Sequence, residues 1–180
     1  MRTVHGAILL LVGSLSWPMT GASAQTLDQR IQALEEKLRC VTIQGTELIV
    51  TSCNVHIRNG QNTTTVKNGT GNLVIGYNEG GEDHSGSHNL VIGSEHTYSS
   101  FGGLVAGYRN TISHEHASVT GGLSNTASQR YASVSGGESN TANGTRANIS
   151  GGWYNTASGD YAHVSGGQWQ TANQNFQSLW

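Results

Sequence analysis

The sequence has little charge, a single proline and few apolar side chains, and each shortage excludes a class of protein. Charged residues make up 11% of the 180 residues, unlike the highly charged chains that stay disordered in water. A formal net charge of −2 leaves no basic surface, so we expect no nucleic-acid partner. Only 35% of the residues are hydrophobic, which is little for an ordinary globular core. What the chain has instead is 25 glycines among recurring Asn, Ser and Thr, which predicts a repetitive solenoid.

Residues 1–24 have the features of an export signal. A weakly basic start precedes the apolar run from Ala7 to Val12, and Ala22 to Ala24 supply the small residues that signal peptidase needs. We therefore expect a mature chain that begins near Gln25 and is located outside the cell or on a bacterial cell surface. No later apolar run is long enough to cross a bilayer, so no membrane span is expected in the mature chain.

Two cysteines, Cys40 and Cys53, remain after the signal. An even number of cysteines in an oxidising compartment favours a disulfide. A bridge within one chain, a bridge between subunits and two free thiols all remain open at this point.

Residues 25–41 are predicted to form a short coiled-coil helix. Its apolar residues are spaced by four, three, four and three positions, as in the seam of a coiled coil: Leu27, Ile31, Leu34, Leu38 and Val41. Two heptads are marginal as an isolated helix, so we expect this segment to associate with copies of itself. The alternative is a single amphipathic helix that lies on the neighbouring domain.

Residues 42–70 form a β-rich transition. The segments 41–43 and 48–50 are rich in β-branched residues and flank a glycine turn, and segment 55–57 alternates apolar and polar residues as a third strand would. The polar stretch 61–67 is predicted to be a loop.

Residues 71–180 are a repeat domain. Four consecutive coils of fifteen residues start at Ser118, Ser133, Asn148 and His163, and earlier coils follow the same pattern with small changes in spacing. Each coil is expected to hold two short strands that pair with their copies above and below. The fold class is therefore all-β, a parallel β-roll or solenoid.

The columns of the repeat predict which side chains point inward. Position five is glycine in every coil, position eight is mostly asparagine, and positions two, four and ten alternate with polar neighbours. We expect asparagine side chains to bond along the stack and the branched residues of position two to form a core ladder: Leu73, Leu90, Leu104, Val119, Val134, Ile149 and Val164. One such residue and one Ala per coil bury little surface, so we infer an oligomer.

The early coils carry a family resemblance. Residues 72–76 and 89–93 both read Asn-Leu-Val-Ile-Gly, and Ala127, Ala142 and Ala157 recur in one column. These features resemble the head of the trimeric autotransporter adhesins, the YadA-like β-roll. The resemblance implies a left-handed β-roll, a homotrimer and display on a bacterial surface. The sequence ends at Trp180 without that family's membrane-embedded C-terminal anchor, so we expect a released or truncated member.

The aromatic residues supply the candidate contact surface. Trp153, Tyr154 and Trp169 occupy neighbouring positions of adjacent coils, where exposed aromatic rings often mark a binding surface for a protein or glycan of a host or matrix. Packing between coils or between subunits is the alternative. In position fourteen, Arg146 lies between Tyr131 and Tyr161, which predicts a cation–π stack.

No catalytic constellation, cofactor motif or metal-ligand spacing stands out. The five histidines at 84, 88, 96, 114 and 116 are interpreted as solvated surface residues. We therefore expect a non-enzymatic structural or adhesive protein that needs no cofactor. Two alternatives stay open: a carbohydrate-binding module of a fibre, and an ice-binding β-solenoid that uses the regular Thr-x-Ser/Asn array.

Overall fold

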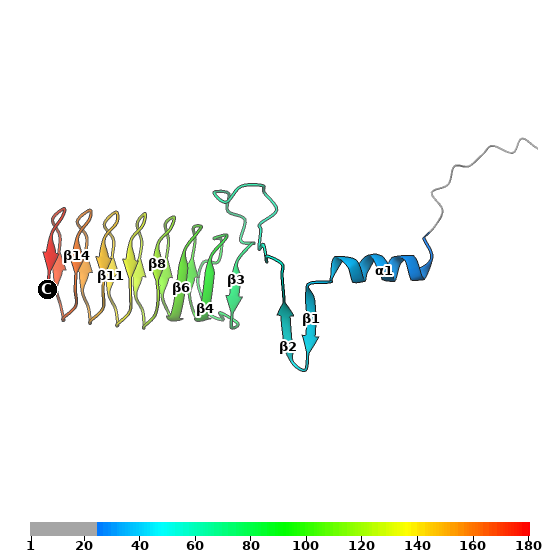
Figure 1. The fold of residues 1–180 in the computed structure, drawn as a ribbon. Coiled ribbons are helices and arrows are strands. Elements are labelled where there is room, and N and C mark those ends of the chain that lie inside the picture. Colours follow the sequence, from blue (N-terminus) through cyan, green and yellow to red (C-terminus); the bar gives the residue numbers. More distant parts are fainter. Residues whose placement is uncertain (1–24) are drawn as a thin grey trace, which may run out of the picture. The chain divides into compact units, whose positions relative to one another are not determined.

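The computed structural model describes residues 25–180, which divide into two compact units between Val55 and His56. The predicted export signal, residues 1–24, lies outside the described residues. The structure is mostly β, with one short helix and a parallel solenoid of about seven turns (Figure 1). The fold class predicted from the repeat is confirmed at this level.

The first unit consists of helix α1 (Leu27–Lys37) and an antiparallel hairpin of β1 (Val41–Gln44) and β2 (Glu47–Val50). The helix begins at a capping box: the Thr26 hydroxyl accepts a hydrogen bond from the Gln29 N–H at 3.2 Å, and the Gln29 side chain accepts one from the Thr26 N–H at 2.9 Å. In the hairpin, Gly45 supplies the positive φ of 61° that the turn requires.

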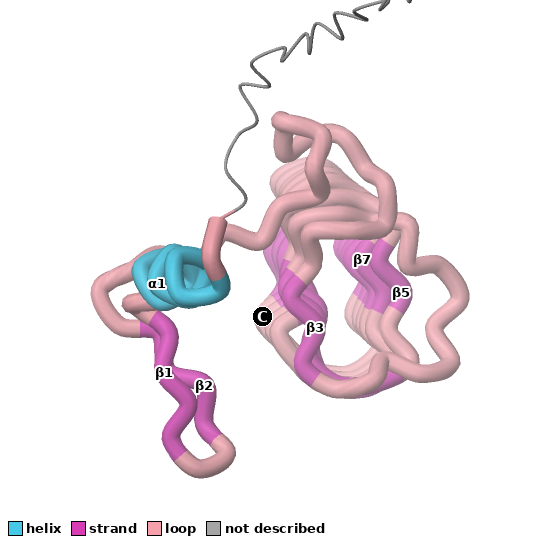
Figure 2. The backbone as a smooth tube through the Cα atoms, turned by 90° about the vertical axis from the view of Figure 1, so that its right-hand side faces the viewer, coloured by secondary structure: helices cyan, strands magenta, loops and turns pink. Residues whose placement is uncertain are grey.

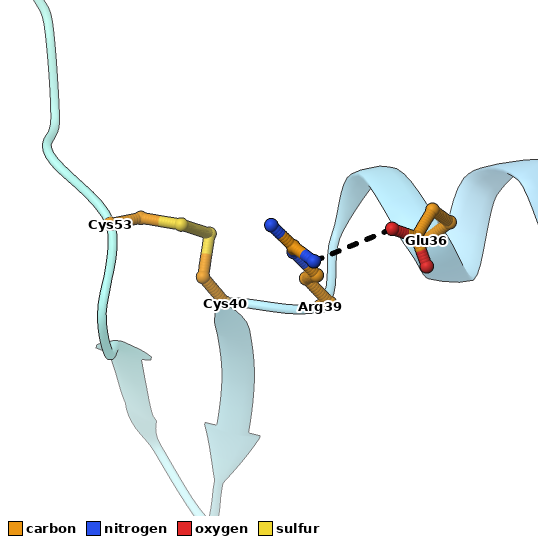
Figure 3. Close-up of a disulfide and its surroundings, with 4 residues drawn as sticks. All are labelled: Glu36, Arg39, Cys40 and Cys53. Carbon is orange, nitrogen blue, oxygen red and sulfur yellow. Dashed lines mark ion pairs between the residues drawn. A yellow bond between two sulfur atoms is a disulfide. The ribbon is translucent and has the colours of Figure 1, made fainter.

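A disulfide between Cys40 and Cys53 closes the base of this hairpin (Figure 3). The two Cα atoms are 5.9 Å apart, a usual separation for a bridge. Of the alternatives open from the sequence, the bridge within one chain is the one that the structure contains. It restrains the hairpin, beside which residues 25–180 place no third strand.

Two details of the sequence prediction are wrong in this region. The helix ends at Lys37, so Val41 begins strand β1 instead of closing the heptad seam. Residues 55–57 form no strand, although their residue types alternate correctly. A strand needs a partner edge, and the outer edges of the hairpin take up no third strand.

The second unit is a stack of coils that form two parallel sheets, and from β4 to β15 each coil contributes one strand to each sheet. The first sheet contains β3 (Leu73–Ile75), β4 (Leu90–Ser94), β6 (Leu104–Tyr108), β8 (Ser118–Val119), β10 (Ser133–Val134), β12 (Asn148–Ile149), β14 (His163–Val164) and β16 (Ser178–Leu179). The second sheet contains β5 (Thr97–Tyr98), β7 (Thr111–Ile112), β9 (Thr126–Ala127), β11 (Thr141–Ala142), β13 (Thr156–Ala157) and β15 (Thr171–Ala172). Figure 2 looks along this stack, with β3 on one side and β5 and β7 on the other.

The core is a narrow column between the two sheets, filled from within one chain. In the coils that start at Ser118, Ser133 and Asn148, positions two, eight, ten and fifteen are buried. In the coil that starts at Ser133 these are Val134, Asn140, Ala142 and Ala147, each 0% exposed. The alanines of position fifteen are core residues that the sequence analysis did not identify. They raise the number of buried apolar residues in each of these coils from two to three. The interior of these coils is therefore covered by residues of the same chain.

The core ladder is confirmed for Val119, Val134, Ile149 and Val164, all 0% exposed, and wrong for Leu73, Leu90 and Leu104. In the first sheet Leu104 pairs with Ser118 and Val105 with Val119, so Val91 and Val105 are the buried residues of the early coils. The isoleucines of position four, Ile75 and Ile92, therefore face outward as well, 53% and 36% exposed.

The cause of this error is a difference of one residue. Val105 precedes its bridge residue Tyr108 by three positions, whereas Val119 precedes the paired Leu123 by four. Aligning the coils on their glycines shifts the earlier strands by one position, and such a shift exchanges the two faces of a strand.

Glycine at position five is required by both conformation and space. Gly122, Gly137 and Gly152 have φ between 85° and 92°, where side chains are strained. A Cβ at any of the three would also collide with the carbonyl oxygen of the glycine in the next coil. The glycine column thus allows successive turns to approach at the spacing of paired strands.

Candidate functional site

The buried polar column at position eight holds the turns of the solenoid in register. The Asn140 N–H donates to Asn125 Oδ1 at 2.9 Å, and the Asn140 Nδ2 group donates to the carbonyl oxygens of Gly136 and Gly152 at 3.1 and 2.9 Å. Asn110, Asn125 and Asn155 repeat this pattern. The predicted bonding of asparagines along the stack is confirmed. Within residues 25–180, every buried side-chain nitrogen or oxygen has a hydrogen-bond partner.

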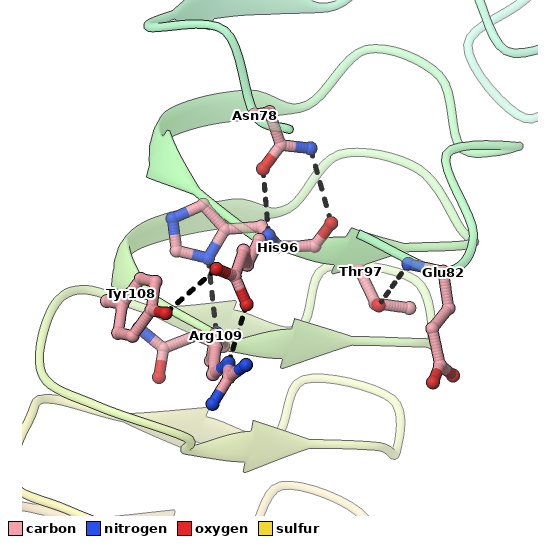
Figure 4. A network of polar contacts seen from close by, with 8 residues as sticks. Asn78, Glu82, His96, Thr97, Tyr108 and Arg109 are labelled. Carbon is pink, nitrogen blue, oxygen red and sulfur yellow. Dashed lines mark hydrogen bonds and ion pairs between the residues drawn. The ribbon is translucent and has the colours of Figure 1, made fainter. Parts of the chain in front are cut away.

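His96 replaces asparagine in this column and is fully buried, so its assignment to the solvated surface is wrong (Figure 4). Its Nδ1 atom accepts from the Asn110 N–H at 3.2 Å, and its Nε2–H donates to the Ile92 carbonyl at 3.0 Å. Because an amide can only donate and a carbonyl can only accept, the ring is the neutral Nε2–H tautomer. The backbone N–H of His96 donates to Asn78 Oδ1 at 2.8 Å. His96 thus makes the same kinds of hydrogen bond as the asparagines of this column.

A charged network that the sequence analysis missed lies beside His96 on the outside. Arg109 Nε donates to Glu95 Oε2 at 2.6 Å, and the Tyr108 hydroxyl donates to Glu95 Oε1 at 2.8 Å. Hydrogen bonds from Arg109 and then Tyr108 lower the pKa of the Glu95 carboxyl below its usual value. Glu95 is in one coil and Tyr108 and Arg109 are in the next, so their contact can be recognised only once the register between the two coils is known.

The predicted aromatic surface is assembled by the fold. The ring centroids of Tyr154 and Trp169 are 4.5 Å apart and nearly parallel, and Trp153 stands at 73° to Tyr154 and 58° to Trp169. The three residues are 41%, 40% and 62% exposed in the order Trp153, Tyr154, Trp169. Two of the rings stack along the axis, which is packing between coils, whereas the Trp153 ring lies parallel to neither neighbour. We call these three residues the aromatic cluster.

A second aromatic column follows position fourteen. The Arg146 guanidinium carbon lies 5.2 Å from the ring centroids of both Tyr131 and Tyr161, so the predicted cation–π stack is confirmed. His116 also stacks on Tyr131, with the ring centroids 5.3 Å apart, a contact that was not predicted from the sequence. Tyr161 continues the stack to Phe176 at 4.8 Å.

Both aromatic columns occupy corners where the backbone is left-handed. Tyr131 and Tyr161 have φ of 59°, and Tyr154 and Trp169 have φ of 54° and 59°. Each such corner costs on the order of 1 kcal/mol or more for a residue other than glycine. An aromatic pair contributes about 0.5–1.5 kcal/mol, so stacking between coils offsets part of that cost.

Hydroxyl side chains cover much of the outer faces of the two sheets. In the second sheet the threonines of position nine alternate with buried residues: Thr97, Thr111, Thr126, Thr141, Thr156 and Thr171. The predicted array therefore exists as a column on the outer face. Its use in binding ice stays a prediction.

The described residues contain no group of three or more His, Cys, Asp or Glu side chains placed to hold a metal ion. A search of the same part of the chain finds no helix with the length and apolar character needed to cross a membrane.

Comparison with known proteins adds no assignment. No family model matches this chain. No curated protein and no solved structure is significantly similar to it.

Proposed function

We propose that this chain is an exported, self-associating β-solenoid with a structural or adhesive role, assembled as a homotrimer. The observation that carries the proposal is the state of the first unit, in which helix α1 has no buried residue. Large apolar side chains are exposed throughout it: Leu27 69%, Ile31 43%, Leu34 57%, Leu38 55%, Ile43 68% and Leu48 65%.

Such a unit is not expected to be stable alone. A helix of 11 residues is shorter than the 12–15 residues or so at which isolated helices become marginally stable. A two-stranded hairpin is likewise marginal in water, even with the Cys40–Cys53 bridge at its base. Copies of the same helix would cover the seam of Leu27, Ile31, Leu34 and Leu38, as in a coiled coil.

The first coils of the solenoid give a second reason for self-association. Outward-facing Leu73 and Ile75 are 46% and 53% exposed, and Ile92 beside them is 36% exposed. In the later coils the same face carries hydroxyl groups, as at Ser133 and Ser135. A contiguous apolar patch on one end of an otherwise polar sheet is typical of a contact surface. The number of three subunits follows from the resemblance to the autotransporter heads.

The test is the mass of the exported chain by light scattering, with a matched pair of helix variants. Leu34→Glu places a charge in the seam, whereas Gln32→Glu places the same charge on the outer side of the heptad. We expect three times the mass of one chain for the parent and for Gln32→Glu, and a smaller species for Leu34→Glu. A parent chain that remains a folded monomer at micromolar concentration would overturn the proposal.

The aromatic cluster supports carbohydrate binding as a second candidate function. Three rings within 4.5–5.9 Å of one another remain 40–62% exposed, which suits the apolar face of a sugar. Glycan-array binding by the parent should be lost in Trp153→Ala and kept in Trp180→Ala, which removes a 90% exposed tryptophan elsewhere. Binding that is equal in the two variants would exclude the cluster as the glycan site.

A further inference from the structure

A polar pocket lies in the loop that precedes the first strand of the solenoid. Its volume is about 380 Å³, and it belongs entirely to the second unit. Its walls come from a single short segment of chain together with one residue of the first coils: His56, Ile57, Arg58, Asn59, Gly60, Asn62, Thr63, Thr64 and His88. Sites for small molecules typically begin at about 300 Å³, so the pocket can hold a group the size of one sugar residue.

The loop around this pocket is fixed by hydrogen bonds of its own. Asn59 is 7% exposed, and its Nδ2 group donates to the Val66 carbonyl at 2.6 Å while its Oδ1 atom accepts from the Gln61 N–H at 3.0 Å. The Asn59 carbonyl accepts from Asn68 Nδ2 at 2.8 Å. A wall held in this way loses little conformational freedom on binding, which favours affinity.

The loop is also tied to the coils through a histidine. The His88 Nδ1 atom lies 3.2 Å from the Thr64 carbonyl oxygen. Since a carbonyl can only accept, Nδ1 carries the proton and Nε2 is the ring atom that remains available for another partner.

The lining has the chemistry of a site for an anion. The lining residues include Arg58 and two histidines, His56 and His88, and include no Asp or Glu. Within residues 25–180, no Asp or Glu lies within ion-pair distance of Arg58. A guanidinium matches the geometry of a carboxylate or sulfate with paired hydrogen bonds.

The remaining lining residues match the other groups of a sugar. Asn62, Thr63 and Thr64 bring amide and hydroxyl groups, which can exchange hydrogen bonds with ligand hydroxyls, and Ile57 adds an apolar contact. Asn62 has a positive φ of 56°, a conformation that asparagine adopts more readily than most residues.

We infer that this pocket binds a saccharide that carries a carboxylate or sulfate group, with the anionic group against Arg58. The inference goes beyond the proposed function, because it requires neither self-association nor the aromatic cluster.

Calorimetric titration of the exported chain tests it with three probes. N-acetylneuraminic acid supplies a carboxylate, a sulfated heparin disaccharide supplies sulfates, and N-acetyllactosamine is uncharged. We expect at least one charged sugar to bind and the uncharged one not to bind. Arg58→Gln should weaken that binding by at least about tenfold, the usual effect of losing a charged hydrogen bond.

The matched control is Arg130→Gln, which removes the same charge from a surface residue that pairs with Glu115 and lies outside the pocket lining. It should bind as the parent does. Equal affinity of the two variants, binding of inorganic sulfate as tight as that of the sugars, or no binding of either charged sugar at millimolar concentration would each overturn the inference. The oligomer mass of Arg58→Gln should equal that of the parent, which separates this test from that of self-association.

Discussion

The asparagine column makes Asn140→Ala the most informative single substitution in the solenoid. The change removes the acceptor of the Asn155 N–H and the donor that reaches the Gly136 carbonyl, and neither group has another partner within residues 25–180. The Gly152 carbonyl keeps the hydrogen bond from the Glu138 N–H. Each buried group left without a partner costs about 1–3 kcal/mol. We therefore expect a loss of about 2–5 kcal/mol in the free energy of unfolding, part of it from the small cavity.

Urea unfolding of the exported chain, followed by circular dichroism, measures this loss. Because each coil contacts only its neighbours, the effect should also be local. Hydrogen exchange should show that the Asn155 amide exchanges faster than in the parent, while the amide of Thr97, several coils away, changes little.

The control is Asn143→Ala in the same coil. Asn143 is exposed, its side chain makes no hydrogen bond within the described residues, and its backbone N–H still donates to the Ala157 carbonyl at 2.9 Å. Its loss should alter stability by at most about 0.5 kcal/mol. If Asn140→Ala is no more harmful than this control, the buried column does not hold the turns together and the reasoning fails.

Three further predictions concern other parts of the stack. Val134→Asp places a charge at a position that is 0% exposed and should lower stability by several kcal/mol. Glu138→Gln changes an exposed residue and should leave the melting temperature almost unchanged. Equal melting temperatures of the two variants would contradict the strand register. His96→Asn restores the regular column and should melt close to the parent, whereas His96→Ala should melt several degrees lower. Arg109→Gln should raise the pKa of Glu95 in an NMR titration. With Arg109 present, the lowered pKa of Glu95 stabilises the folded state at pH values above the usual pKa of a glutamate, and this stabilisation is lost as the pH falls through the lowered pKa.

The parts of the fold that could be predicted are those that the repeat imposes on every coil. Asn125, Asn140 and Asn155 occur at a constant interval, so an interaction between copies follows from the period alone. The stack around Arg146 was predictable for the same reason, since residues fifteen apart lie one above the other.

Prediction failed where the period changes. Leu104 and Val105 are equally good strand residues, and only the pairing of Val105 with Val119 decides which one points inward. That pairing cannot be inferred by aligning the repeats, because the turn between Val105 and Tyr108 is one residue shorter than the corresponding turn between Val119 and Leu123. His96 was missed for a related reason: it occupies an asparagine position of a coil whose spacing is irregular.

The candidate sites divide in the same way. The aromatic cluster was predictable because Trp153, Tyr154 and Trp169 lie in the regular coils. The pocket beside Arg58 was not, since it lies in a loop without a repeat and depends on a contact with His88, which is 24 residues from Thr64. A single sequence holds no periodic signal for a contact of that kind.

The constant fifteen-residue interval from Ser118 onward has a consequence for how such a molecule changes over generations. Because the ladder of Asn125, Asn140 and Asn155 joins each turn only to the next, duplication of one whole interval in the gene inserts a turn whose upper and lower contacts already fit. Each duplication lengthens the stack by about 4.8 Å, the spacing between paired strands. The length of the solenoid can therefore change in equal steps of one turn while the core residues of the existing turns stay the same.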